Sequence, residues 1–202
     1  MVEERIREGY KRTEVGLIPV DWEVEKLGNI VEIRSGESPS KFEIKKSGIP
    51  YFKVEQLNNS TKYQKNTNYF IDAFNPIKSG SIIFPKRGAA ILTNKLRILS
   101  QDSFMDTNLM TLSILTNDHT EYIYYWLYNF GLWRLADTTS VPQINNKHII
   151  PFLIPIPPLK EQKAIAEVLS DTDDLITCLQ KLIDKKEKIK KGAMQKLLTG
   201  KE

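Results

Sequence analysis

Few residues in this sequence could catalyse a reaction, and those few are poorly placed for it. The two histidines, His119 and His148, lack a neighbouring cysteine or carboxylate at the spacing that a zinc site needs. The single cysteine, Cys178, supports neither a disulfide framework nor a cysteine-built metal site and fits a reducing compartment. We expect no metal centre in this chain.

Motifs for nucleotide binding, nuclease activity and methyl transfer are also missing. The sequence holds no GxxxxGK[ST] loop and no GxGxxG turn after a strand. Acid-x-Lys triplets occur at 43–45, 161–163 and 184–186, but none has a second acid in a strand context that would help to hold Mg²⁺. An amino-methyltransferase would carry Asn-Pro-Pro-aromatic, whereas residues 74–77 read Phe-Asn-Pro-Ile. We therefore predict a non-catalytic chain without a cofactor.

Binding chemistry is better represented, in three polar loops. Residues 86–90 (KRGAA) place two cations before a glycine, residues 55–68 are almost entirely amides, hydroxyls and lysines, and residues 138–146 concentrate hydroxyls and amides. Arg and Lys pair with guanine edges and phosphates, and Asn and Gln pair with adenine. A solvated loop is the alternative for residues 55–68. The predicted DNA contacts are Lys62, Lys65, Lys86, Arg87, Asn94, Lys95, Arg97, Ser140 and Gln143.

The net charge tempers this prediction. The formal charge is +4 and the sequence pI about 9.0, and the charge divides equally between residues 1–157 and 158–202. Because phosphate neutralisation supplies most non-specific affinity, this chain alone should bind DNA weakly. A second copy or basic partner subunits would have to supply the rest.

Two kinds of element must position these loops. Short β-branched and aromatic runs separated by Gly, Pro and Asn predict a compact, mostly β region. In that region Asn94 and Lys95 could form a hairpin turn, because Asn tolerates the left-handed conformation. The predicted strands are residues 49–55, 81–85, 89–93, 96–100 and 109–115.

Helices interrupt this region. Residues 121–136 carry an aromatic stripe, which we expect to pack into the domain rather than to stack on bases. Asn145 and Asn146 could cap a short helix over residues 147–149.

Residues 159–199 form the second kind of element, a single long helix. Neither Gly nor Pro occurs between Leu159 and Lys191, and apolar residues recur every seven positions, which is typical of a coiled coil. A rod of roughly 60 Å would extend beyond a domain of about 35 to 40 Å, so part of its apolar face should need a helix from a second copy or another subunit. The predicted pairing residues are Val168, Leu175, Ile176, Leu179, Leu182, Ile183 and Ile189.

Length and composition set the overall class. The 202 residues suffice for one mixed domain and one extended element, and 41% hydrophobic with 27% charged residues excludes disorder. We predict an α+β fold: a mostly β domain with a few helices, followed by one long C-terminal coiled-coil helix. The sequence has neither an apolar run near 20 residues nor a signal-peptide core, so we expect a cytoplasmic protein without a membrane partner.

Several of these segments together resemble a known family. The segments 13–30 (TEVGLIPVDWEVEKLGNI), 77–91 (IKSGSIIFPKRGAAI), 140–176 (with PIPPLKEQKAIAEVL) and 190–201 (KKGAMQKLLTGK) make the chain similar to specificity subunits of type I restriction-modification systems. The resemblance implies a target recognition domain at 1–157 that grips the DNA major groove, and a conserved spacer helix at 158–202 that pairs antiparallel as a ruler. It also implies docking of methylation (M) and restriction/translocase (R) subunits, with S-adenosylmethionine, ATP and Mg²⁺ belonging to those partners.

The chain departs from that family in one respect. The usual member has two recognition domains and two spacer helices, whereas this sequence has one of each. The hypothesis that follows is a homodimer on double-stranded DNA that reads an interrupted palindrome, because target symmetry mirrors protein symmetry. The alternative is a coiled-coil interaction protein or a silent recognition-domain cassette, and a stand-alone nuclease is disfavoured because the acid cluster is absent.

Overall fold

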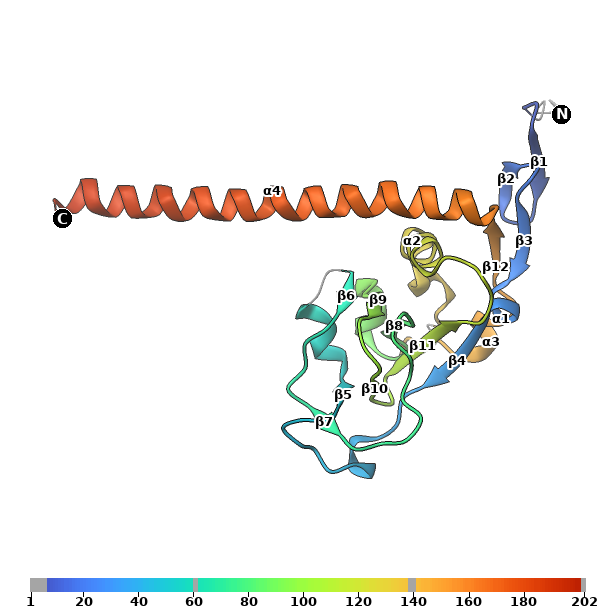
Figure 1. Ribbon diagram of the computed structural model, residues 1–202, viewed down its shortest axis with the longest axis horizontal. Coiled ribbons are helices and arrows are strands. Elements are labelled where there is room, and N and C mark those ends of the chain that lie inside the picture. Colours follow the sequence, from blue (N-terminus) through green and yellow to red (C-terminus); the bar gives the residue numbers. More distant parts are fainter. Residues whose placement is uncertain (1–6, 60–61, 138–140, 201–202) are drawn as a thin grey trace. The chain divides into compact units, whose positions relative to one another are not determined.

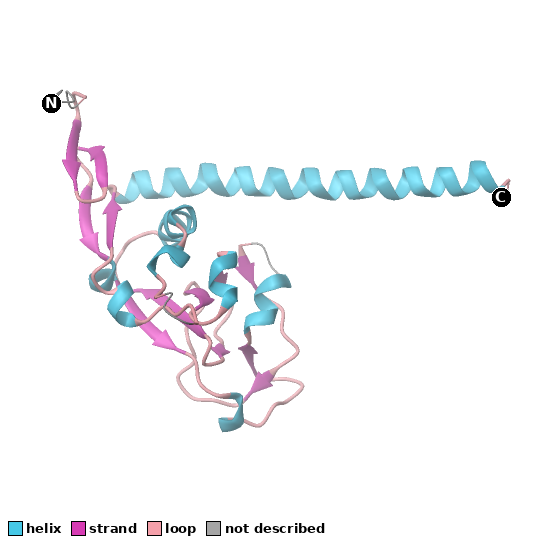
Figure 2. Cartoon of the chain, turned by 180° about the vertical axis from the view of Figure 1, so that it is seen from behind, coloured by secondary structure: helices cyan, strands magenta, loops and turns pink. Residues whose placement is uncertain are grey.

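The protein consists of small β-sheets with short helices, followed in the sequence by one long helix (Figures 1 and 2). The structure is a computed structural model, and it describes residues 7–59, 62–137 and 141–200. The chain separates into two compact units, residues 1–163 and 164–202. The predicted α+β class is confirmed.

Twelve strands are described within these ranges. They are β1 (Tyr10–Thr13), β2 (Gly16–Pro19), β3 (Glu23–Lys26), β4 (Val31–Ser35), β5 (Ile49–Phe52), β6 (Tyr63–Gln64), β7 (Phe70–Ile71), β8 (Ile82–Pro85), β9 (Arg97–Leu99), β10 (Phe104–Met105), β11 (Leu109–Ile114) and β12 (Leu153–Ile156).

The helical segments are mostly short. The α-helices are α1 (Leu27–Ile30), α2 (Thr120–Phe130), α3 (Asn146–Ile149) and α4 (Leu159–Thr199), and the 3₁₀ segments are η1 (Pro39–Lys41), η2 (Val54–Asn59), η3 (Ala89–Thr93) and η4 (Leu132–Leu135).

The largest sheet has five strands in the order β4-β11-β8-β9-β6. Its central strands β11 and β8 pair antiparallel, and all four residues of β8 are buried. Strand β4 pairs antiparallel with the other edge of β11, from Val31 opposite Ile114 to Ser35 opposite Met110. The ends of β4 and β8 and the start of β11 therefore meet at one end of this sheet, and the loops that leave it there lie together.

Smaller sheets complete the domain. Strands β10, β5 and β7 form a three-stranded sheet, and β1 and β2 form a hairpin. Strand β12 pairs antiparallel with β3, from Leu153 opposite Lys26 to Ile156 opposite Glu23. This pairing returns the chain to its first elements before α4 begins.

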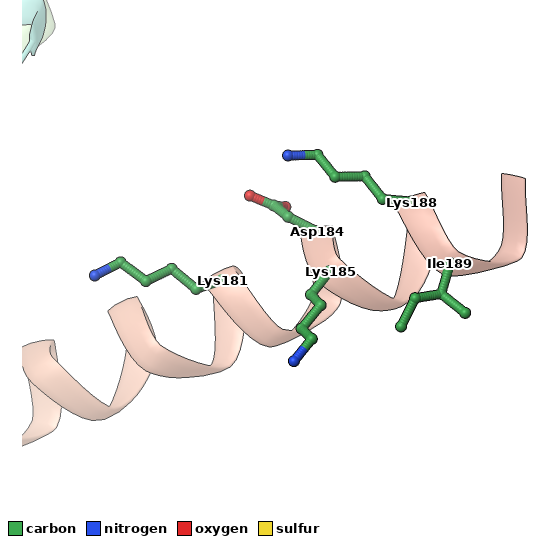
Figure 3. A pocket seen from close by; sticks show the side chains of 5 residues that line it. All are labelled: Lys181, Asp184, Lys185, Lys188 and Ile189. Carbon is green, nitrogen blue, oxygen red and sulfur yellow. The ribbon is translucent and has the colours of Figure 1, made fainter. Parts of the chain in front are cut away.

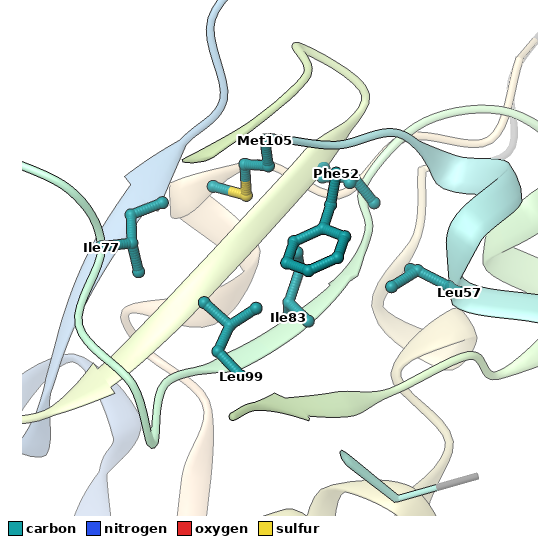
Figure 4. Packing of buried hydrophobic residues seen from close by; sticks show 7 residues of the cluster. Phe52, Leu57, Ile77, Ile83, Leu99 and Met105 are labelled. Carbon is teal, nitrogen blue, oxygen red and sulfur yellow. The ribbon is translucent and has the colours of Figure 1, made fainter. Parts of the chain in front are cut away.

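A buried apolar cluster joins the two larger sheets. Figure 4 shows its side chains converging from different strands and loops. Burial of this apolar surface is the main favourable contribution to the stability of residues 1–163. The cluster consists of Phe52, Leu57, Ile77, Ile83, Leu99, Met105 and Leu109.

The structure corrects the predicted strand at 89–93. These residues form the 3₁₀ segment η3 instead, which Gly88 enters with a positive φ of 81°. Asn94 does adopt the predicted left-handed conformation, with φ 49°, but it ends η3 rather than joining two strands. A run of five apolar residues is too short for its pattern to distinguish strand from helix.

The aromatic helix is shorter than predicted. It ends at Phe130, because Gly131 has φ 78° and the chain then re-forms as η4. The predicted packing into the domain is confirmed for Tyr122, whose hydroxyl donates to the Pro155 carbonyl at 2.7 Å, and for Trp126, which packs against Phe152.

Residues 49–68 also differ from their prediction. The strand over 49–55 stops at Phe52, and the polar segment 55–68 contains η2 and β6 rather than a continuous loop. Two amides of this segment are buried: Gln56 accepts the Lys53 N–H at 2.7 Å, and Gln64 donates to the Asn66 carbonyl at 3.2 Å. These two amides hold the local backbone.

The predicted helices near the end of the domain are present. Helix α3 spans Asn146–Ile149, and the Nδ1 of His148 accepts the Asn145 N–H at 3.1 Å, so this histidine serves as a helix cap. Helix α4 spans Leu159–Thr199, as the sequence predicts. None of the helices in the described ranges is both long and apolar enough to cross a membrane.

Candidate nucleic-acid interface

One end of the five-stranded sheet brings together polar and basic residues that are distant in the sequence. Ser35 ends β4, and Lys86 follows the last residue of β8. Because both strands pair with the start of β11, these two residues become neighbours. We call the group Arg34, Ser35, Lys86, Arg87 and Gln143 the sheet-end surface.

Lys86 is held firmly within this surface. Its backbone N–H donates to the Asn108 carbonyl and its own carbonyl accepts the Ile144 N–H, both at 2.8 Å. Its ammonium donates to the Ser35 hydroxyl at 2.8 Å. Burial, together with the adjacent charge of Arg87, lowers the pKa of Lys86 below its usual value. The charged form is therefore less well solvated here than in water, and an approaching anion such as a phosphate would stabilise it.

Gln143 joins the same surface from the other polar loop. It forms an isolated β-bridge with Arg87, and the Gly88 N–H donates to the Pro142 carbonyl at 2.8 Å. The Gln143 amide donates to the Asn145 side chain at 3.1 Å. Arg87 is exposed and Gln143 half-buried, so a cation and an amide lie side by side at the surface. This pair has the chemistry that reads base edges.

Arg34 completes the surface and was not among the predicted residues. Its guanidinium donates to the Asn75 carbonyl at 3.0 Å and so holds the loop that precedes β8 against β4. No spacing in the sequence marks this residue. Its position depends on the pairing of β4 with β11, which links residues 77 positions apart.

A second group of predicted residues lies against helix α2. The Asn94 amide donates to the Tyr128 carbonyl at 2.8 Å. The Arg97 guanidinium donates to the Leu96 carbonyl at 2.6 Å, and burial lowers its pKa, an effect that Tyr124 and Tyr128 oppose. Arg97 is half-buried, as is Lys95. The Asn94 hydrogen bond thus joins the end of η3 to α2.

The structure holds Lys62 inside the domain. Its ammonium forms an ion pair with Glu121 at 3.0 Å, and Tyr63 also donates a hydrogen bond to this carboxylate. Burial alone would raise the pKa of Glu121, but the hydrogen bonds from Tyr63 and Lys62 lower it below its ordinary value. Lys65 is exposed. Ser140 lies outside the described residues.

The first turn of α4 belongs to the same unit as the sheets. The Trp22 indole donates to the Glu161 carboxylate at 3.0 Å. Gln162 is buried, donates to Asp118 at 2.7 Å and to the Pro157 carbonyl at 2.9 Å, and accepts the His119 N–H at 2.8 Å. We predicted the domain to end at residue 157, and these contacts extend the compact unit to Lys163.

The rest of α4 exposes the apolar stripe that the sequence predicts. Figure 3 shows Ile189 pointing away from the side that carries Asp184 and Lys188. The side chains predicted for pairing are between 49% and 66% exposed: Val168, Leu175, Ile176, Leu179, Leu182, Ile183 and Ile189. The side that carries Lys181, Asp184 and Lys188 is charged, whereas Lys185 lies on the same side as Ile189 (Figure 3).

The fold gives residues 1–163 a basic, amide-bearing surface at one end of the main sheet, and a long helix follows in the sequence. The chain belongs to the family described as type I restriction modification DNA specificity domain, whose model matches residues 19–191.

Similar proteins agree with this assignment. The putative type I restriction enzyme MjaX specificity subunit of Methanocaldococcus jannaschii is 31% identical over 95% of this chain, and the MjaVIII specificity subunit of the same organism is 29% identical over 95%. The chain spans about half the length of these curated relatives, 49% in both cases.

Solved structures show the same fold. A chain from a type I restriction-modification system, solved in work on its assembly and conformational transition, has a TM-score of 0.75 at 19% identity, covering 90% of this chain and 46% of its own length. The HsdS subunit from Thermoanaerobacter tengcongensis has a TM-score of 0.67 at 18% identity, covering 87% of this chain and 43% of its own.

Proposed function

We propose that this chain is a non-catalytic DNA sequence-specificity subunit of a type I restriction-modification complex. It would direct adenine methylation and ATP-dependent cleavage by M and R subunits, which would hold S-adenosylmethionine, ATP and Mg²⁺. The observation that carries the proposal is the convergence of Lys86, Arg87 and Gln143 at one sheet end. Family membership and the similarity to specificity subunits support the same function.

The sheet-end surface is the part that we propose to contact double-stranded DNA. Arg87 and Gln143 would read base edges, and Lys86 would contact a phosphate, which would restore the stability that burial takes from its charged form. Lys65 and Lys95 would add contacts to the phosphate backbone of the DNA. We leave Lys62 out of this interface, because Glu121 already binds its ammonium.

We propose in addition that α4 pairs with α4 of a second copy. The exposed apolar side chains recur at sevenfold spacing from Val168 to Ile189, and an isolated helix gains little by exposing them to water. Antiparallel pairing about a two-fold axis would present two identical recognition domains, so the target would be an interrupted palindrome.

Co-purification with the M subunits, followed by mapping of methylated adenines, tests the DNA proposal. We expect methylation at one interrupted palindromic motif, lost or strongly reduced in the K86A/R87A double variant. The matched control is K185A/K188A, which removes the same charge from α4 and should leave the motif unchanged. An asymmetric bipartite motif would contradict the symmetric dimer, and an unchanged motif and yield in K86A/R87A would contradict the interface.

Analytical ultracentrifugation tests the pairing of α4. The L175K/L182K double variant should abolish self-association, because two charges would replace apolar side chains that the proposed pairing buries. The control is K181A/K188A, on the charged side of the helix, which should remain associated. A dimer of unchanged stability in L175K/L182K would refute this assignment. A dimer that supports no methylation would favour a coiled-coil interaction protein.

A further inference from the structure

Phe74 is an aromatic side chain that the fold places entirely in solvent. It is 99% exposed, although Ala73 before it contacts the cluster of Tyr51, Ile71 and Phe104, and Ile77, three residues after it, is buried in the main core. Burial of a phenylalanine side chain is strongly favourable, and this fold forgoes that gain at Phe74. The local backbone therefore directs this ring outward.

The loop that carries Phe74 is anchored on both sides. Before it, Asp72 forms an ion pair with Lys45. After it, Asn75 has a left-handed φ of 56° and its carbonyl accepts the Arg34 guanidinium at 3.0 Å. Asn is among the few residues that adopt this conformation readily, so the turn is encoded in the sequence.

This loop adjoins the sheet-end surface. Arg34, which binds the carbonyl next to Phe74, immediately precedes Ser35, which in turn binds the Lys86 ammonium at 2.8 Å. Because Arg34 and Ser35 are consecutive residues of β4, their side chains point to opposite faces of the strand, so the loop of Phe74 and Lys86 lie at the same end of the sheet on opposite faces of β4. Proteins that deform DNA combine cations with an apolar ring, because cations hold the backbone while the ring enters between bases.

We propose that Phe74 is a DNA wedge that inserts between base steps or stacks on an exposed base at the target site. This inference rests on the proposed DNA-binding function and adds a contact that distorts the duplex. Lys86 and Arg87 would position the backbone, and the anchored turn would present the ring with little loss of conformational entropy. A single exposed ring fits a base stack better than a protein surface, which would require a larger apolar patch.

The test uses the complex with the M subunits and a duplex that carries the mapped target, with 2-aminopurine placed in turn along the site. The wild-type complex should change the fluorescence at one step. In F74A this change should disappear and affinity should fall roughly 5- to 150-fold, the range typical of a lost base-aromatic stack. F74W should restore both. Thermal unfolding of F74A should match wild type, because the ring makes no internal contact that supports the fold.

Three results would overturn the wedge. The first is specific binding by F74A with wild-type affinity and fluorescence. The second is weaker assembly of F74A with the M subunits, while the fraction that does assemble binds DNA normally. This result would assign Phe74 to a protein contact. The third is absence of sequence-specific binding by the wild-type complex, which would overturn the proposed function itself and is distinguished because it precedes any substitution at Phe74.

Discussion

The two compact units treat their apolar residues in opposite ways. Residues 1–163 enclose Phe52, Leu99 and Met105 in a cluster with essentially no exposure. Among the described residues beyond Lys163, Ala166 is the one buried apolar side chain, while leucines and isoleucines of α4 stay about half exposed. The first unit completes its own core, whereas the helix keeps a surface that another helix would cover.

This difference separates the two tasks that we propose. A recognition surface must be rigid before it meets DNA, and the sheet-end surface is fixed by backbone hydrogen bonds on both sides of Lys86. A pairing surface gains its stability from association, so it stays exposed until a partner arrives. The same type of substitution should therefore change the free energy of unfolding by different amounts in residues 1–163 and in α4.

The core substitution Phe52→Ala should have the largest effect. Removal of this fully buried ring should lower the free energy of unfolding of residues 1–163 by about 3–5 kcal/mol. All three tryptophans, Trp22, Trp126 and Trp133, lie in this unit, so tryptophan fluorescence during urea unfolding reports it selectively.

The matched variant on the helix is Leu175→Ala. At concentrations where α4 is unpaired, it should change the same transition by less than about 0.5 kcal/mol, because the side chain is 59% exposed. Equal losses in both variants would show that the apolar side of α4 is already covered within one chain.

Gln162→Ala should have the next largest effect and lower the free energy of unfolding of residues 1–163 by about 2–4 kcal/mol. The truncation leaves the His119 N–H, the Pro157 carbonyl and Asp118 without their amide partner in a buried place, and each such group costs about 1–3 kcal/mol. Gln180→Ala on the exposed helix removes one hydrogen bond, to Asp184, worth only about 0.2–0.5 kcal/mol. Thermal unfolding measures both losses of stability. Similar shifts of the unfolding temperature in the two variants would mean that the Gln162 hydrogen bonds contribute no more than the one at Gln180.

Local signals predicted the helix well and the sheets in part. The sevenfold repeat and the absence of Gly and Pro between Leu159 and Lys191 predict most of α4, and continuous apolar runs mark β8 and β11. Strand β3 was not predicted, because three of the four residues of its sequence EVEK are charged, and it becomes a strand through pairing with β12. Such pairing joins residues more than a hundred positions apart and leaves no local pattern.

The site shows the same limit. Loop chemistry alone selected Lys86, Arg87 and Gln143 as candidates for DNA contact, but their meeting depends on a bridge across 56 positions of sequence. The same chemistry also selected Lys62, whose ion-pair partner Glu121 is 59 positions away. Residue type predicts which side chains could bind DNA, and tertiary contacts decide which remain free to do so.

Glu121→Gln should destabilise residues 1–163 by about 1–2 kcal/mol at neutral pH, because a buried charge-assisted contact with Lys62 is lost. The folded-state pKa of Glu121 lies below its ordinary value of 4.5, so the advantage of wild type is complete above that pH. It should disappear as the pH falls through the lowered pKa. Urea unfolding from pH 7 to pH 3 measures this difference; Glu187→Gln on the exposed helix should stay near wild type, and a pH-independent loss in Glu121→Gln would contradict the linkage.

The smallest expected effect is a gain in stability on the helix. Gly192 lies inside α4 with no atom within 4 Å of the position that a Cβ would take, so Gly192→Ala should stabilise the helix by up to about 1 kcal/mol. Gly200 follows the helix with a left-handed φ of 65°, so the same substitution there should destabilise its end. Far-UV circular dichroism during heating should show the two shifts with opposite signs, while tryptophan fluorescence of residues 1–163 stays unchanged. A shift in both signals would mean that the helix and the recognition domain unfold together, and the two units would then be one cooperative structure.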